Sequence, residues 1–437
     1  MHEVEAWLSG LPDCSSFNTS ATAIRSSPMP RTPSPTKRRR LDGAGDNNND
    51  DKEARNDVTP RAISLSTKPS SFSSNANNEP FSAREHVSVS RTSSPSIRSS
   101  QSSRSSPTKQ DLAMRFARDL PIHYRSIPSA PQRVQALAEQ LADLESKQGI
   151  LPGRLRATLQ AYHSPGEPIK NYMFDDRHNS NSAGGKELDT DVQTLDRELE
   201  HLKEIRDNTQ ECNSRGRVFH EVEWNETVHS PMLRLATKRF KELACRNLTQ
   251  ANLSNRWTNP ELKDSRIDYG ILVAPEPDSD LYHRILTYIQ RRHDSTGTEL
   301  GQVNPLIDID IDRPIAVAVE TKRLATGVEK ANTQLAGFGR CMLRLQHDVT
   351  AFLADTESGS NNNSHAIVLP LLTVIGSAWE VDFMIREKGL AVIYGPVQLG
   401  STQTLTNCYR LYRSLDILFR WAHLQCVEWW STTLKTV

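Results

Sequence analysis

The chain has 437 residues, which is enough for two or three domains if all of it folds. It carries 53 basic and 53 acidic residues, so its formal net charge is zero and any contact with nucleic acid must come from a local basic patch. Hydrophobic residues make up 36% of the chain, below the usual share for globular domains, and the deficit is concentrated in the first third. We therefore expect an unfolded first third and one sizeable core in the remainder.

The cysteine pattern and the hydropathy exclude two further classes of protein. The six cysteines lack any C-x-x-C spacing, which argues against a disulfide framework or a zinc site and favours buried free thiols. No stretch reaches the ~18 apolar residues that a membrane span needs. We expect a soluble intracellular protein without a membrane partner. The cysteines are Cys14, Cys212, Cys245, Cys341, Cys408 and Cys426.

Residues 1–118 are predicted to form a disordered tail. Serine, threonine, proline, asparagine and arginine dominate from residue 13 onward, and such a segment buries too little apolar surface to offset its chain entropy. This tail holds a compact basic cluster of Lys37, Arg38, Arg39 and Arg40. The cluster is typical of a nuclear localisation signal, and the alternative is a solvated charge run in a disordered segment.

Residues 119–210 are predicted to form an accessory helical region with a linker. Apolar residues recur three and four apart over 130–147 and again over 190–205, which predicts two helices. The Asn/Ser/Gly-rich stretch 179–185 separates them. These helices are expected to pack as an accessory layer or as a short coiled coil.

Residues 211–437 show longer apolar runs and repeated tryptophans, which indicate an α/β domain with a mixed sheet between helices. In chain order we expect a helix over 219–245, strands over 265–274 and 315–322, a helix over 327–346, a strand over 368–377 and a helix over 409–430.

Charged residues stand at the ends of two of these predicted strands. Five apolar residues lead into Glu320 and Lys322, which share one face because strand side chains alternate. Asp268 begins the preceding strand, and sequential strands commonly pair. Two carboxylates that converge repel each other unless a cation joins them, and hard oxygen ligands suit Mg²⁺. Taken alone, Glu-x-Lys is a weak signal, because charged residues cap many strands.

The order of elements and motifs resembles the PD-(D/E)XK nuclease superfamily, and more narrowly a group of fungal nuclease-like proteins. The resemblance covers about 215–430 and implies a restriction-endonuclease-like core. It rests on the stretches Glu223-Trp224-Asn225-Glu226-Thr227-Val228-His229-Ser230-Pro231, Ile267-Asp268-Tyr269, Glu320-Thr321-Lys322, Gln334-Leu335, Leu369-Pro370-Leu371-Leu372-Thr373-Val374, Gly376-x-x-Trp379 and the Trp-rich C-terminal helix.

The resemblance implies a metal site and a catalytic lysine. Asp268 and Glu320 would bind Mg²⁺ or Mn²⁺, and Lys322 would orient or activate the attacking water. One departure from the family pattern is that Ile267, not proline, precedes Asp268.

The flanking helices supply further candidate residues. Many members of the superfamily place an acid on the helix before the sheet; Glu223 is our first candidate and Glu226 the second, against an exposed helix face as the alternative. His229 is predicted to be structural rather than to touch phosphate. Gln334 would face the site from the following helix.

Other charged residues are weaker candidates. Asp308, Asp310 and Asp312 would share one face of a strand and could bind a cation, but an acidic edge or loop before Pro314 is favoured. Basic residues that are candidates for phosphate contacts, or else a solvated face, are Arg234, Lys238, Arg239, Lys241, Arg266 and Arg323.

Three functions are consistent with these patterns. The first is a Mg²⁺-dependent nuclease that hydrolyses phosphodiester bonds in DNA. The second is a catalytically inactive nuclease fold that binds nucleic acid or protein. The third is a structural module in which Asp268, Glu320 and Lys322 form an internal salt bridge. The joint presence of these three residues favours the first.

Replacing residues 37–40 with alanine should leave the protein in the cytoplasm, because the cationic cluster would no longer be available to bind an import receptor. The measurement is fluorescence microscopy of the tagged full-length chain. Alanine at Arg91, Arg98 and Arg104, which are scattered through the same tail, is the control. Unchanged nuclear accumulation of the first variant would reject the signal.

Overall fold

A computed structural model describes residues 106–162, 168–175, 185–214, 219–258, 266–297, 301–307, 309–356 and 366–435. The basic cluster and nearly all of the predicted disordered tail lie outside these residues. Within the described ranges, no helix combines the length and the apolar character that crossing a membrane requires.

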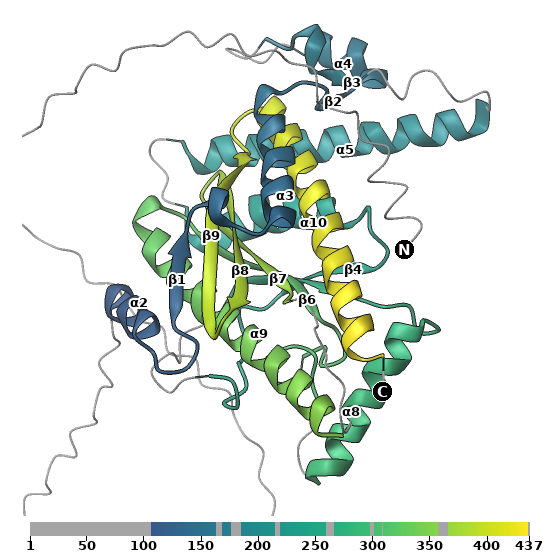
Figure 1. Cartoon of the computed structure of the whole chain (residues 1–437). Helices are drawn as coiled ribbons and strands as arrows, with labels where there is room; N and C mark the ends of the chain where they lie inside the picture. Colours follow the sequence, from purple (N-terminus) through teal and green to yellow (C-terminus); the bar gives the residue numbers. More distant parts are fainter. Residues whose placement is uncertain are drawn as a thin grey trace, which may run out of the picture. The chain divides into compact units, whose positions relative to one another are not determined.

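A seven-stranded mixed sheet forms the centre of the domain, as the sequence predicts (Figure 1). Its strand order is β1-β9-β8-β7-β6-β5-β4. The β1/β9 and β6/β7 pairs are parallel and the other neighbours are antiparallel. The strands are β1 (Ile122–Arg125), β4 (Leu243–Asn247), β5 (Tyr269–Val273), β6 (Ile315–Lys322), β7 (Val368–Ile375), β8 (Ala378–Glu387) and β9 (Leu390–Ser401). Outside this sheet, β2 (Leu151–Pro152) and β3 (Phe174–Asp175) form a short parallel pair.

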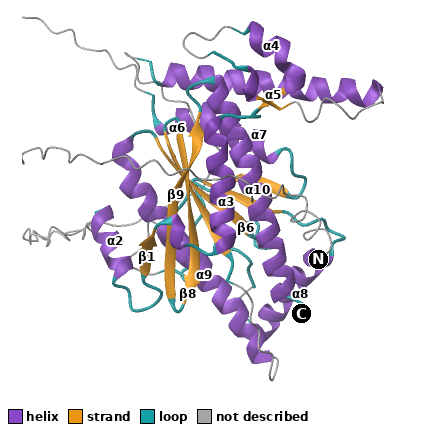
Figure 2. Cartoon of the chain, turned by 45° about the horizontal axis from the view of Figure 1, so that its top comes forward, coloured by secondary structure: helices purple, strands orange, loops and turns teal. Residues whose placement is uncertain are grey.

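Helices cover both faces of the sheet, so its central strands are apolar on both sides (Figure 2). Helix α9 (Val328–Thr356) packs on β6 and β7, while α10 (Leu405–Thr433) packs on β9 and β6 from the other face. The remaining helices are α2 (Pro107–Arg115), α3 (Gln132–Asp143), α4 (Arg156–Ala161), α5 (Gly185–Cys212), α6 (Glu221–Trp224), α7 (Ser230–Thr237) and α8 (Asp280–Thr296).

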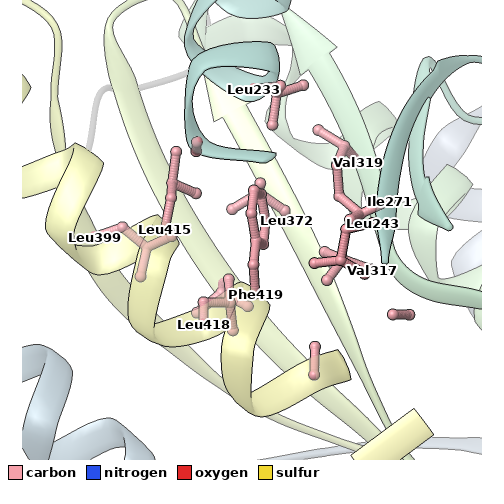
Figure 3. Packing of buried hydrophobic residues seen from close by; sticks show 14 of the residues in the cluster. Leu233, Leu243, Ile271, Val317, Val319, Leu372, Leu399, Leu415, Leu418 and Phe419 are labelled. Atoms are coloured by element: carbon pink, nitrogen blue, oxygen red, sulfur yellow. The ribbon is translucent and has the colours of Figure 1, made fainter. Parts of the chain in front are cut away.

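Strand β6 divides the core into two clusters. All eight of its residues are buried. Val317 and Val319 belong to the cluster beneath α10, where Leu418 and Phe419 approach Leu372 of β7 (Figure 3). Ala318, on the opposite face, belongs to the cluster beneath α9. The alternation of side chains along β6 therefore directs Glu320 and Lys322 to the same face as Ala318.

Close packing of α9 on the sheet depends on a small residue. A Cβ atom at Gly339 would lie 2.5 Å from the Met384 Sδ atom of β8. The absence of that atom lets the helix backbone approach the strand.

Two segments differ from the prediction. The helix predicted over 219–245 ends at Thr237, and Cys245 lies in β4, which pairs antiparallel with β5. The predicted helix was too long because the apolar residues of α7 follow helical spacing and no strong turn signal separates them from the edge strand β4. Residues 107–115, predicted as tail, form α2; the Ser106 hydroxyl caps its first turn and Met114 is fully buried.

The predicted accessory region contributes directly to the sheet and its cover. β1 adds a parallel edge strand beside β9, α3 contacts β9 and α10, and α5 contacts α10 and α7. The predicted helices at 130–147 and 190–205 correspond to α3 and to part of the longer α5. Five cysteines lie in the described ranges, and none of the five forms a disulfide bond there.

Phe419→Ala should lower the free energy of unfolding by about 3–5 kcal/mol, because it removes a fully buried ring between α10 and the sheet. Chemical denaturation measures the change. Leu424→Ala on the same helix, where the side chain is 55% exposed, is the control and should cost less than about 0.5 kcal/mol. Equal losses in the two variants would contradict this packing.

Candidate functional site

Asp268 and Glu320 meet at the ends of two neighbouring strands. Asp268 directly precedes β5, and its backbone N–H donates to the Val319 carbonyl oxygen at 3.0 Å. Tyr269 pairs with Val319, so Asp268 lies beside the Glu320 end of β6, close enough for its charge to act on Glu320. The prediction that these two strands are neighbours is therefore confirmed.

Glu320 is a buried carboxyl group with one unused oxygen. Its side chain is 1% exposed, and Oε1 accepts a hydrogen bond from Lys322 Nζ. Oε2 is buried and has no hydrogen-bond partner among the residues that the structure describes. Burial, reinforced by the charge of Asp268, raises the pKa of Glu320 to about 8 in spite of the attraction of Lys322. The group is thus poised between its acid and its carboxylate near neutral pH.

Lys322 sits between the two carboxyl groups of Glu320 and Glu221. Its Nζ donates to Glu320 and to the Thr321 carbonyl at 2.6 Å, and lies 3.5 Å from Glu221 Oε1. A Cβ atom at Gly327 would lie 2.9 Å from Lys322 Cγ, so this glycine leaves room for the lysine stem. Burial disfavours the cation, but the neighbouring carboxylates, Glu320 foremost, raise the pKa of Lys322. The amine is therefore a cation at neutral pH.

The acid that the first helix brings to Lys322 is Glu221. Glu223, the first candidate from sequence, instead accepts a hydrogen bond from the His220 backbone N–H at 2.7 Å and completes a capping box. Glu226, the second candidate, is exposed. Three acids within six residues indicate an acidic helix start, but the sequence pattern cannot say which of them is used for capping.

Asp268 is held by a chain of side chains that ends at His229. Asp268 Oδ2 accepts from the Thr321 backbone N–H at 3.0 Å and from Thr321 Oγ1 at 2.6 Å. The side-chain amide of Asn225 lies 2.8 Å from Thr321 Oγ1 and 2.8 Å from His229 Nδ1. Asn225 and His229 begin and end a single π-helical turn between α6 and α7, and such turns often occur at functional sites.

The protonation of His229 follows from its partners. Nε2 lies 2.8 Å from the Gly376 carbonyl oxygen, which can only accept, so Nε2 carries the proton. Burial lowers the pKa of His229 to about 4, so the ring is neutral and Nδ1 must accept. We therefore assign the Asn225 atom facing Nδ1 as the amide nitrogen, since amide oxygen and nitrogen exchange places by a flip. Asn225 then donates to His229 and Thr321, and Thr321 donates to Asp268. As predicted, His229 has structural partners.

Gln334 supports the chain leading into Asp268. Its Nε2 donates to the Arg266 carbonyl at 2.9 Å, and its Oε1 is buried without a partner in the described part of the chain. Gln334 therefore contacts the backbone two positions before the acid.

Other charged candidates serve the fold. Asp310 lies in a loop and pairs with Arg246 at 3.0 Å, while Asp308 lies outside the described residues. Arg323 donates to the Phe219 carbonyl at 2.7 Å, and Arg239 lies 3.6 Å from Asp416. For Asp310, the loop position and the ion pair with Arg246 favour a structural role over a second cation site.

The donor set available to a cation consists of carboxylate oxygens. The described residues contain no group of three or more His, Cys, Asp and Glu side chains arranged to hold a metal ion. Asp268 Oδ1 and Glu320 Oε2 accept no hydrogen bond from the residues that the structure describes. Two oxygens from two strands therefore remain available.

His229 should contribute a loss of stability of up to about 3 kcal/mol as the pH drops from 6.5 towards 4, because it stays neutral in the folded state and binds a proton when unfolded, whereas the raised pKa of Glu320 acts in the opposite direction. His229→Gln should lack this part of the slope, whatever its absolute stability. His283→Gln, an exposed histidine on α8, should keep it. Denaturation curves across this pH range provide the measurement, and parallel slopes in all three proteins would disprove a neutral His229.

Comparison with known proteins identifies the family of the chain. No curated protein shows significant similarity to the chain. The family model described as the PD-(D/E)XK nuclease superfamily matches residues 166–427, a stretch that includes both strand ends of the site, α9 and most of α10. The chain therefore belongs to the PD-(D/E)XK nuclease superfamily.

Proposed function

We propose that the protein is a nuclease that uses a divalent metal ion to hydrolyse phosphodiester bonds in DNA. The observation that carries the proposal is the buried Glu320 carboxyl group near Asp268 and beside the Lys322 cation, with one oxygen that has no partner among the described residues. Membership of the superfamily supports it. A buried carboxyl group with an orphaned oxygen is costly to folding, which is a common feature of sites shaped for a ligand.

The residues present fit Mg²⁺ or Mn²⁺. Asp268 and Glu320 supply hard oxygen donors at the ends of adjacent strands, and each has an oxygen without a partner among the described residues. When bound, the ion would acidify a coordinated water and polarise the phosphoryl oxygens.

The side chains around the metal ligands have distinct tasks. Lys322 is cationic, so it donates hydrogen bonds to the phosphate and stabilises negative charge as it develops. Glu221 lies on the other side of Nζ and positions the lysine. Thr321 holds Oδ2 of Asp268 through two hydrogen bonds. These bonds fix the orientation of the carboxylate, so Oδ1 is held in place for a metal ion.

A second function is a nuclease fold that binds DNA without cutting it. The observation that favours this alternative is the direct contact of Lys322 with Glu320, which neutralises the buried carboxylate from within the chain. The two functions differ in one outcome, the hydrolysis of a DNA strand in the presence of a divalent ion.

For either function we propose the nucleus as the site of action. The basic cluster at residues 37–40 supports this location.

Purified protein should cut DNA in Mg²⁺ or Mn²⁺, and Glu320→Gln should lower the rate by at least about a hundredfold, because it removes a charged ligand from the centre of the site. Glu221→Gln should cost about tenfold through loss of lysine positioning. Glu223→Gln is the control; its amide can still cap the helix, so the rate should stay near that of the wild type.

The measurement is cleavage of labelled duplex, single-stranded and branched DNA, with RNA for comparison. Circular dichroism and denaturation curves would establish that each variant folds. Cleavage by Glu320→Gln at the wild-type rate would contradict the site, and no cleavage of any substrate by the wild type would leave the binding function.

A further inference from the structure

An open pocket of about 600 Å³ lies beside the distal half of α9, away from the carboxylates. Its walls come from α9, from the end of β8, from the loop before β1 and from the segment after β4. The charged and titratable residues that line it are Asp119, Arg256, Arg344, His347, Asp348 and Arg386.

The two aspartates of the pocket do not balance its arginines. Asp348 pairs with Arg256 at 2.8 Å and also with Arg292 at 3.2 Å. Asp119 pairs with Arg344 at 2.8 Å. Each carboxylate is therefore already committed, one of them to two guanidinium groups.

Two arginines outside these pairs bring further positive charge. The side chain of Arg386 forms no hydrogen bond or ion pair with any residue that the structure describes, although its backbone pairs within the β8–β9 ladder. Arg340 is 1% exposed, and its guanidinium donates to the backbone carbonyl of Asp119 at 2.6 Å. Its Nε and Nη1 atoms are buried without a partner in the described part of the chain. Burial and the like charge of Arg344 lower the pKa of Arg340 to about 10, which still leaves a cation at neutral pH.

Three arginines and two aspartates thus line a pocket in a chain of zero net charge. Guanidinium groups recognise phosphate through paired N–H donors, and buried, unpartnered donors lose the least when an anion arrives. His347, whose pKa burial and Arg386 lower, is neutral and offers a further hydrogen-bond donor without a charge.

The pocket lies along the helix that begins at the proposed catalytic site. Gly327 touches the stem of Lys322, and Arg344 follows 17 positions later, about 25 Å along a helix axis. That length corresponds to about seven base pairs of duplex DNA. Resting on the proposed function, we propose that this pocket binds a backbone phosphate of the DNA duplex about seven base pairs from the bond that is cut.

The test compares DNA that spans the distance with DNA that does not. Affinity is measured by fluorescence anisotropy of the full-length protein in EDTA, which prevents cleavage, over a series of salt concentrations. One probe is a duplex of about 24 base pairs, and the other is a hairpin with a stem of about five base pairs, too short to reach from the site to the pocket.

Arg386→Gln should weaken binding of the long duplex about fivefold at low salt and reduce the slope of log K against log[salt] by about one, because one phosphate contact is lost. Arg386→Glu should weaken it further. Binding of the short stem should not change. Arg291→Gln, which removes an exposed and unpaired arginine of α8 from the described surface, is the control and should bind both probes as the wild type does.

The outcomes separate this proposal from the nuclease itself. Equal affinity of the Arg386 variants and the Arg291 control for the long duplex would overturn the phosphate pocket, even if the wild type cuts DNA. Binding that depends on Arg386 without cleavage in any metal would support the pocket and overturn the nuclease. A wild-type protein that binds neither probe in EDTA would overturn the pocket, and cleavage in Mg²⁺ or Mn²⁺ would decide the nuclease separately.

Discussion

The burial of Glu320 near Asp268 is the constraint on which the rest of the site depends. A carboxylate taken out of water is costly unless a cation or hydrogen bonds compensate it, and here the structure provides one lysine for one of its two oxygens. The glycine before α9 follows from this requirement, since a larger residue would displace the stem of Lys322. The position of α6 serves the same requirement, because its first residue, Glu221, is a second carboxylate beside Lys322.

The two carboxyl groups have different surroundings. Asp268 receives two hydrogen bonds from Thr321. Glu320 is deeper, and its burial favours the neutral acid. Such a pair avoids facing two full negative charges in the absence of a cation, and a divalent ion would remove the reason for Glu320 to hold its proton. His229, which is linked to Thr321 through Asn225, is neutral and so adds no further charge next to the two carboxyl groups.

Sequence patterns predicted the parts of this site that depend on burial and strand pairing. Strand β6 has the predicted bounds because an apolar run that ends in charged residues is typical of a buried strand reaching the edge of its sheet. Asp268 lies near Glu320 because strands that follow each other in sequence commonly pair. Helix starts were harder, since Glu221 and Glu223 differ only in which one closes the capping box. The hairpin of β8 and β9 escaped prediction because its strands are buried unevenly and interrupted by irregular pairing.

The proposed phosphate pocket would explain how a chain without net charge recognises a polyanion. Many of its cations are used within the fold, as in the pairing of Arg239 with Asp416 or the capture of the Phe219 carbonyl by Arg323. Attraction over long distances is then weak, because paired charges cancel beyond a Debye length. Under the proposals made above, recognition depends on a few cations at defined positions, with Lys322 between two carboxyl groups at one end of α9 and Arg340 and Arg386 towards the other. Spacing along the helix, rather than total charge, would then set how a duplex lies across the site.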